Sequence, residues 1–216
     1  MLVIVAIMLI FVSCSQDHNI FKDDDKNVDD SDFQCGNYEV TVETPVMPEI
    51  PEIDELPSYD GATTNCAQTP EIIEGKLVLG DGCYRGCITV SGNVVITGSG
   101  CGKTALFCDD VNALAVINIK ENSSVTIEKI TLKGLTRGIF AEKKSTVFIN
   151  ETVISDCLKG GINVCGGESD CGSELFFERS VIENIVPENQ TEISYGISMG
   201  PGTLSVEDSV LHGFNS

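Results

Sequence analysis

An eight-residue alternation of apolar and polar positions occurs four times in the second half of the chain. Its first, third and eighth positions are apolar in every copy, and its fourth position is always Glu or Asn. Successive copies start 22, 28 and 29 residues apart, at Val125–Leu132, Val147–Ile154, Leu175–Ile182 and Leu204–Leu211. Because a unit this short cannot bury its apolar face alone, the repeat predicts stacked units, that is, a solenoid.

Short β-rich runs lie upstream of these copies and between them. The upstream runs are separated by Gly, Asp or Ser, and they are Leu77–Leu79, Cys87–Val90 and Val94–Ile96. Two further runs, Val116–Ile119 and Ile139–Ala141, precede the first two copies by matching distances. Each coil is therefore expected to contain at least two strands joined by a turn. No segment after residue 76 has the periodicity of an amphipathic helix.

These features resemble the right-handed parallel β-helix of the pectin-lyase-like superfamily over roughly residues 77–216. Gly82–Val90 followed by Val94–Gly98 is similar to the entry coil of pectinesterase-type members, and the eight-residue unit is similar to their generic coil. The resemblance implies an all-β fold, a right-handed parallel β-helix with three sheets. We assign residues 62–216 to this domain. Because the chain stops within a coil, the possibility of a longer β-helix that continues past residue 216 stays open.

Residues 1–13 are predicted to be a lipoprotein-type signal peptide. The unbroken apolar run 2–12 is too short to cross a bilayer but suits the apolar core of a secretory signal. Phe11–Cys14 resembles the lipobox of bacterial lipoproteins, which implies lipid attachment at Cys14 and a place in the cell envelope, at the outer membrane or cell surface. Phe11 itself departs from that pattern, so an ordinary cleaved signal is the alternative.

Residues 14–61 are predicted to be a disordered acidic tether. The block Asp23–Asp32 has little to bury, and four prolines between Pro45 and Pro57 favour extended, polyproline-like backbone. The whole chain carries a formal net charge of −20, which argues against nucleic acid as a partner.

The cysteines indicate an oxidising compartment, because a chain of 216 residues contains ten of them. Aligning the repeats predicts that Cys157 is a buried core thiol in a column with Leu135, Ile185 and Phe214. With Cys14 assigned to the lipid, the favoured local disulfides are Cys165–Cys171 and Cys101–Cys108, and elimination leaves Cys83–Cys87 and Cys35–Cys66. A closed zinc site lacks a second cysteine pair and well-placed His residues, so no metal or cofactor is predicted.

Two motifs offer candidate chemistry. Stacking of the copies about 4.8 Å apart aligns four polar residues in a column that can bind cations or sugar hydroxyls. The column consists of Glu128, Asn150, Glu178 and Glu207. A solvated polar row beside a turn is the alternative that we favour. Residues 98–104 resemble a P-loop, but Thr97 stands where the first Gly is required, so nucleotide binding is a distant alternative.

The catalytic sets of the carbohydrate-active β-helix families are incomplete in this chain. Asp109-Asp110 lacks the companion motifs of polygalacturonase-like members, and Leu211–Phe214 lacks the Gly that should precede the His. Polysaccharide lyases need a base beside acidic Ca²⁺ ligands, and the sequence shows no acidic cluster for the available bases, Arg137, Lys159 and Arg179.

We therefore expect an exported, lipid-anchored β-helix module of the cell envelope, without enzymatic activity and with a structural, adhesive or glycan-binding role. Its expected partners are the membrane, through the N-terminal lipid, and a surface polysaccharide or another envelope protein. The alternative is a polysaccharide-degrading lyase or hydrolase whose site lies partly on coils beyond residue 216.

Overall fold

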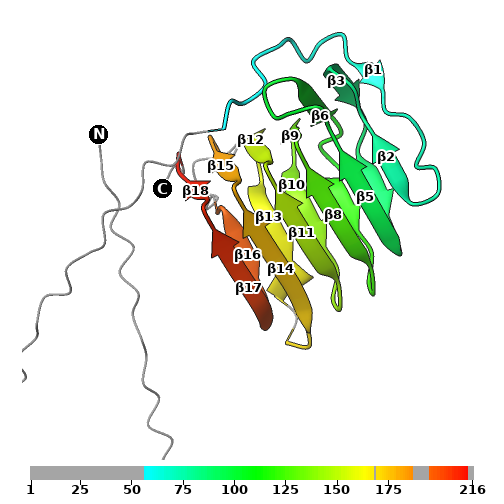
Figure 1. The fold of residues 1–216 in the computed structure, drawn as a ribbon. Helices are drawn as coiled ribbons and strands as arrows, with labels where there is room; N and C mark the ends of the chain where they lie inside the picture. Colours follow the sequence, from blue (N-terminus) through cyan, green and yellow to red (C-terminus); the bar gives the residue numbers. More distant parts are fainter. Residues whose placement is uncertain (1–55, 168, 187–194, 214–216) are drawn as a thin grey trace, which may run out of the picture. The chain divides into compact units, whose positions relative to one another are not determined.

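The computed structural model describes residues 56–167, 169–186 and 195–213, which fold into a parallel β-helix. Its strands stack in sequence order along the solenoid axis, and the ribbon colour changes steadily from β2 to β17 (Figure 1). Each coil visits three sheets in turn, which we name sheet B, sheet A and sheet C, before the next coil begins. The predicted all-β, parallel β-helix is confirmed.

The strand order follows from this winding. Sheet A contains β1 (Ala67–Gln68), β3 (Gly82–Arg85), β6 (Thr104–Cys108), β9 (Thr131–Gly134), β12 (Val153–Cys157), β15 (Val181–Glu183) and β18 (Val210–Leu211). Sheet B contains β2 (Lys76–Val78), β5 (Asn93–Thr97), β8 (Ser124–Glu128), β11 (Thr146–Asn150), β14 (Ser173–Glu178) and β17 (Gly202–Glu207). Sheet C contains β4 (Ile88–Val90), β7 (Ala115–Ile119), β10 (Arg137–Ala141), β13 (Gly160–Val164) and β16 (Ile197–Met199). In the described residues, five complete three-strand turns run from β2 to β16, and β17 and β18 begin a sixth.

The four copies of the eight-residue unit occupy equivalent places in successive coils. Their first residues are aligned in sheet B, at Val125, Val147, Leu175 and Leu204. Their last residues are aligned in sheet A, at Leu132, Ile154, Ile182 and Leu211. The unit is thus the stretch of chain that crosses the corner from sheet B to sheet A, and the sequence repeat and the structural repeat coincide.

Side chains that alternate inward form continuous apolar columns through the coils. In sheet B, Ile96, Ile127, Ile149 and Phe177 lie in register, and each is at most 1% exposed. Full burial of one such side chain contributes about 1.5–3 kcal/mol to stability. Because every coil adds members to the same columns, the core is one cluster that runs along the solenoid.

The corner between sheets B and A explains why the middle of the unit is polar. The fifth residue has left-handed backbone in every copy, with φ of 57°, 46°, 41° and 44° at Lys129, Glu151, Arg179 and Asp208. In three copies the sixth residue is Thr or Ser, and the Ser180 hydroxyl donates to the Glu178 carbonyl at 2.6 Å. The backbone N–H of Thr152 donates to that same hydroxyl from the preceding coil at 3.1 Å. The hydroxyls therefore satisfy backbone groups that a turn out of the sheet would leave unpaired.

One predicted disulfide is confirmed, and three predicted pairings are wrong. Cys165–Cys171 closes the loop after β13, which contains the short 3-10 turn Cys165–Gly167. The other disulfides are Cys66–Cys83 and Cys87–Cys108, which rules out the predicted pairs Cys101–Cys108, Cys83–Cys87 and Cys35–Cys66.

Strand geometry is the reason for these corrections. Extended chain advances about 3.3 Å per residue, so β3 carries Cys83 and Cys87 beyond the usual Cα separation of a disulfide, about 4.4–6.8 Å. β6 separates Cys101 from Cys108 in the same way. The bonds Cys66–Cys83 and Cys87–Cys108 instead join neighbouring coils, and the Cα atoms of Cys87 and Cys108 are 4.9 Å apart. Within a coil, the observed bond is the one that closes the loop between β13 and β14.

Cys157 is a free thiol with no exposed surface, which confirms its predicted place in the core. The predicted alignment of its column is wrong by one residue, because Cys157 lies opposite Gly134 and not opposite Leu135. The register shifts within β12, where Asp156 has a φ of 53°. An extra residue in the strand, a β-bulge, accounts for the shift.

Several predictions concern residues outside the described ranges. These are the signal peptide 1–13, the lipid site Cys14, the cysteine Cys35 and the tether as far as residue 55. Residues 56–61, the last part of the predicted tether, lie against sheet A, where the Tyr59 N–H donates to the Thr131 hydroxyl at 3.2 Å. Within the described ranges, no helical segment has the length and hydropathy that crossing a membrane requires.

Candidate functional site

The outer face of sheet B carries the predicted polar column beside a row that contains two aromatic rings. The central outward positions of its strands are aligned from coil to coil, at Val95, Thr126, Phe148, Phe176 and Ser205. These residues alternate with the buried columns, so the two-residue period of the strand directs them to the outside of the solenoid.

Phe148 and Phe176 form a stacked pair at the centre of this row. Their ring centroids are 4.7 Å apart and their planes differ by 9°, which matches the spacing of neighbouring coils. Phe148 is 40% exposed, although full burial of a Phe ring would be worth about 1.5–3 kcal/mol. The small residues Thr126 and Ser205 follow the pair on either side in the row. Phe176 is half-buried, so the pair is a partly exposed aromatic surface bordered by small polar side chains.

The predicted column of Glu128, Asn150, Glu178 and Glu207 lies along one edge of this row. Direct strand pairing aligns Glu128 with Asn150, Asn150 with Glu178, and Glu178 with Glu207, as the repeat predicts. The Thr97 hydroxyl extends the column by donating to the Glu128 carboxylate at 3.0 Å. The column therefore offers carboxylate and amide oxygens over four successive coils and a hydroxyl on a fifth.

Arg179 moderates the negative charge of the column. Its guanidinium donates to the Asn150 side-chain oxygen at 2.9 Å and forms an ion pair with Glu151 at 3.2 Å. Asn150 itself separates the carboxylates of Glu128 and Glu178, which reduces like-charge repulsion between neighbouring coils. The column consequently combines acceptors, one guanidinium and one amide, a set suited to hydroxyl groups.

A second polar row borders the aromatic pair on its other side. Ser124, Thr146, Glu174 and Thr203 are aligned there, and the Thr146 hydroxyl donates to Glu174 at 3.3 Å. Ligand-binding sites commonly combine apolar and aromatic surface with a few placed polar groups. The face of sheet B has this composition.

The described residues give no support to the cation-binding interpretation of the column. Over the described ranges, no group of three or more His, Cys, Asp or Glu side chains is placed to hold a metal ion. The Glu207 carboxylate accepts from the neighbouring Ser205 hydroxyl at 3.2 Å. Hydrogen bonding is therefore the chemistry that this column displays.

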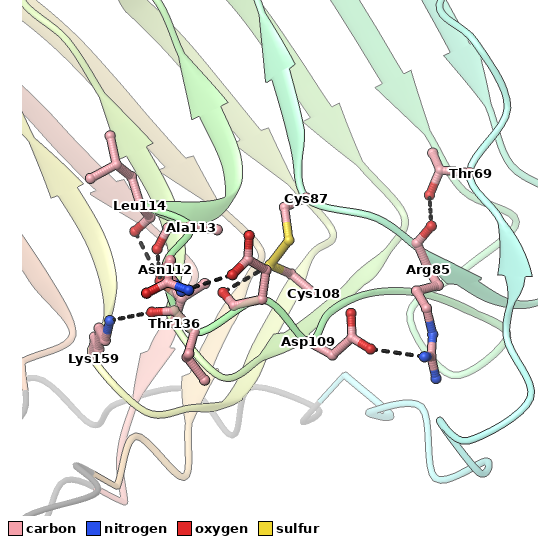
Figure 2. The surroundings of a disulfide bond; sticks show 12 residues. Thr69, Arg85, Cys87, Cys108, Asp109, Asn112, Ala113, Leu114, Thr136 and Lys159 are labelled. Atoms are coloured by element: carbon pink, nitrogen blue, oxygen red, sulfur yellow. Dashed lines mark hydrogen bonds and ion pairs between the residues drawn. A yellow bond between two sulfur atoms is a disulfide. The ribbon is translucent and has the colours of Figure 1, made fainter.

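The Asp109 and Asp110 carboxylates both make contacts that hold the loop after β6. Figure 2 shows this loop beside the Cys87–Cys108 disulfide, with Asp109 directed to Arg85. The Arg85 guanidinium donates to Asp109 at 2.8 Å, and the N–H of Asn112 donates to the Asp110 carboxylate at 2.9 Å. Both carboxylates therefore stabilise the backbone after β6, the second as an Asx turn.

The three candidate bases are occupied by structural contacts. Lys159 donates to the backbone carbonyl of Val111 at 2.7 Å, at the loop that Figure 2 shows. Arg137 donates to the Tyr195 hydroxyl at 2.7 Å. Arg179 meets Asn150 and Glu151 on sheet B, as described above. Of the three, Arg179 lies beside several acidic side chains, but over the described residues these do not form a group placed to hold a metal ion, as a Ca²⁺-dependent lyase requires.

The structure argues against the P-loop alternative at residues 98–104. A P-loop lysine begins a helix, whereas β6 begins at Thr104, directly after Lys103. The Thr104 side chain is fully buried, and its hydroxyl donates to the Gly80 carbonyl at 2.8 Å while accepting from the Ser99 N–H at 2.9 Å. That hydroxyl is consequently not available to a metal ion. The loop serves instead to cover part of sheet A.

A hollow of about 440 Å³ lies beside this loop, and its lining includes Cys101, Leu56 and Lys129. Burial raises the pKa of the Cys101 thiol to about 11, against a weaker opposing effect of backbone hydrogen bonds. The thiol donates to the Glu151 carbonyl at 2.6 Å. A thiol in this state is a poor nucleophile, because the thiolate is the reactive form.

No protein-family model, no curated protein and no solved structure matches this chain. The parallel β-helix assignment therefore rests on the strand pairing, and the pectin-lyase-like identity stays a resemblance.

Sequence reasoning identified the polar column but not the aromatic pair beside it. The signal was present at the second position of the repeat unit, which reads Thr126, Phe148, Phe176 and Ser205. Two aromatic residues at the same outward position of consecutive coils lie a strand spacing apart, so their rings are close enough to stack.

Proposed function

We propose that this protein is a non-catalytic, glycan-binding module of the cell envelope that presents the outer face of sheet B to a polysaccharide. The observation that carries this proposal is the partly exposed Phe148–Phe176 stack between two aligned polar rows. An aromatic ring offers an apolar surface to the C–H groups of a sugar, while the rows offer partners for its hydroxyls.

The orientation of the rows indicates an extended ligand. Both polar rows and the aromatic row run along the solenoid axis, because each coil adds one residue to each. A polymer with repeated hydroxyl groups can therefore lie along the axis and meet similar groups at successive coils. This geometry favours a polysaccharide chain over a compact small molecule.

Charge restricts the class of polysaccharide. The chain has a net charge of −20, and the two rows contain Glu128, Glu174, Glu178 and Glu207. An acidic polysaccharide would be repelled, so the ligand is a neutral or a positively charged glycan.

Export and anchoring complete the proposal. The three disulfides support an oxidising compartment, since disulfides persist outside the cytosol. The resemblance of Phe11–Cys14 to a lipobox supports lipid attachment at Cys14, with the membrane as the second partner.

Binding to an array of neutral, cationic and acidic glycans tests the proposal. The full chain should bind at least one neutral or cationic polysaccharide, and Phe148→Ser/Phe176→Ser should weaken that binding by about tenfold or more, through loss of aromatic contact. Phe140→Ser, an outward Phe on β10 of sheet C, is the matched control and should bind as the wild type does. Loss of binding in the control alone, or cleavage of any glycan on the array, would contradict the proposal.

A further inference from the structure

The hollow beside the loop that follows β5 has the size and the lining of a small-molecule site. Its volume of about 440 Å³ lies within the range of about 300–1,000 Å³ that is usual for such sites. Leu56 and Pro57 form one wall, and the loop supplies Gly100, Cys101 and Gly102. The exposed surface of the lining is mainly apolar. The hollow therefore favours a ligand with an apolar body.

Hydrogen bonds hold the loop side of the hollow in place. The Gly100 N–H donates to the Lys129 carbonyl at 2.9 Å, and the Lys103 N–H donates to the Gly100 carbonyl at 3.0 Å. The Thr131 hydroxyl donates to the Cys101 carbonyl at 2.6 Å, which joins the loop to β9. Because the loop is ordered by its own contacts, a ligand would not have to pay the entropy of ordering it.

Two lysine side chains line the hollow without a counter-ion. Within the part of the chain that the structure describes, neither Lys103 nor Lys129 forms an ion pair or a side-chain hydrogen bond. Lys120, Lys133 and Arg179 each form an ion pair with a carboxylate. The chain carries a net charge of −20, so acidic partners are abundant. Two unpartnered ammonium groups at one hollow therefore indicate a place for an anion.

A third charged residue of the lining limits the charge of that anion. Glu151 also lines the hollow, although its carboxylate forms an ion pair with Arg179 at 3.2 Å. Two ammonium groups and one carboxylate leave the lining itself with a single net positive charge. A group with one negative charge suits this balance better than a doubly charged phosphate, which Glu151 would repel more strongly.

We propose that this hollow binds a small amphipathic carboxylate, of the class of a medium-chain fatty acid. Its hydrocarbon chain lies against Leu56, Pro57 and the glycines of the loop, and its carboxylate meets the Lys103 and Lys129 ammonium groups. Lysine suits this role because its flexible stem adds apolar contact while its ammonium donates charge-assisted hydrogen bonds. This inference does not depend on glycan binding.

Calorimetric titration of the full chain with decanoate tests the site. We expect saturable binding to one site, and decanol, which has the same chain length without the charge, should bind about tenfold more weakly or less. Lys103→Gln/Lys129→Gln should weaken decanoate binding by about tenfold for the same reason. Lys76→Gln/Lys144→Gln removes two exposed lysines that do not line the hollow and should bind within about twofold of the wild type.

Filling the hollow tests the place of the hydrocarbon chain. A Cβ atom at residue 102 would lie 3.2 Å from the Cβ of Pro57, so the side chain of Gly102→Leu would take up space in the hollow. We expect this variant to lose decanoate binding although both lysines remain. Protection of Cys101 needs no substitution. Saturating decanoate should slow alkylation of its thiol by about fivefold, while Cys157 in the main core stays unreactive.

Several outcomes would overturn the proposal. These are the absence of saturable decanoate binding to the full chain, equal affinities for decanoate and decanol, and an unchanged rate of Cys101 alkylation. Undiminished binding by a folded Lys103→Gln/Lys129→Gln variant would overturn it as well. Tighter binding of decyl phosphate than of decanoate would contradict the assignment of a singly charged head group.

Discussion

The outer faces of sheets A and B carry the same alternation of residues, but one is covered and the other is open. On sheet A, Val153 and Val181 point away from the main core, yet they are at most 3% exposed, because Leu56 and the loop with Cys101 pack over them. On sheet B the equivalent outward residue Phe148 is 40% exposed. Each of the two sheets thus presents outward rows of side chains. The segments outside the repeat decide which rows are covered and form a second core, and which stay open to a ligand.

The largest effect should come from placing a charge on the covered face. Val153→Asp buries a carboxylate without a partner, so we expect the free energy of unfolding to fall by about 3–5 kcal/mol. Phe148→Asp at the open face should cost less than about 1.5 kcal/mol, since its carboxylate stays hydrated and only the ring contact is lost. Denaturant unfolding of both variants measures the difference. Equal losses would contradict the distinction between the two faces.

Removing the cover itself should have the next largest effect. Leu56→Ser withdraws apolar contact from the cluster of Cys101, Val153 and Val181, and we expect a loss of about 1–3 kcal/mol. Cys101 should then react faster with a thiol reagent at neutral pH, because the buried thiol gains solvent access. Cys157 in the main core serves as the internal control and should stay unreactive. A change in Cys157 would mean that the whole solenoid had opened.

Burial of the Cys157 thiol should make the free energy of unfolding depend on pH, and we expect this effect to be of intermediate size. Burial raises the pKa of Cys157 to about 12, compared with 9.0 for an unperturbed thiol. The folded state then holds its proton above the pH at which the unfolded chain releases it, so stability falls as the pH rises from about 9 towards 12. At pH about 10 the loss should be about 1.4 kcal/mol. Cys157→Ala should lower stability at pH 7 and flatten this part of the curve; an unchanged slope would contradict the assignment.

The smallest effect should come from an ion pair at the surface. Lys120 donates to Glu142 at 2.7 Å, and this hydrogen bond lowers the pKa of the Glu142 carboxyl below its usual 4.5. The pair stabilises the fold above that pH, and the contribution disappears as the pH falls through the lowered pKa. Because both side chains are partly exposed, Glu142→Gln should cost no more than about 1 kcal/mol at pH 7. A larger loss of stability, measured by thermal unfolding, would mean that exposed contacts contribute as much to stability as the contacts of the covered face.

The fold was predictable because each repeat unit carries the alternation of apolar and polar residues that a coil of the solenoid requires. Each coil repeats the same inward apolar positions, so the spacing of Ile127, Ile149 and Phe177 predicts stacked coils with these residues in register, whereas the three-sheet cross-section came from the resemblance. The alignment failed at Cys157, where a one-residue bulge leaves no signal in the hydrophobic pattern. Strands β3 and β6 also escaped prediction, because Gly82–Arg85 and Thr104–Cys108 lie outside the repeat unit.

The contacts between coils were harder to predict than the coils themselves. Cys87 and Cys108 are 21 residues apart, and only the winding of sheet A brings them together. The same winding places Leu56 over Val153, almost a hundred residues later in the chain. The polar column was predictable since it lies within the repeat, whereas the aromatic pair required comparison of outward positions between copies.

The most direct test of the account is the response of the Phe rings to a glycan in solution. The full chain, labelled at its nine phenylalanines, is titrated with the neutral and cationic oligosaccharides while the ring resonances are followed by NMR. We predict that Phe148 and Phe176 shift together and saturate, whereas Phe107 and Phe140, on sheets A and C, do not respond. A titration in which no oligosaccharide moves the Phe148 and Phe176 resonances, or in which Phe107 and Phe140 respond instead, would contradict the claim that the open face of sheet B is the binding surface.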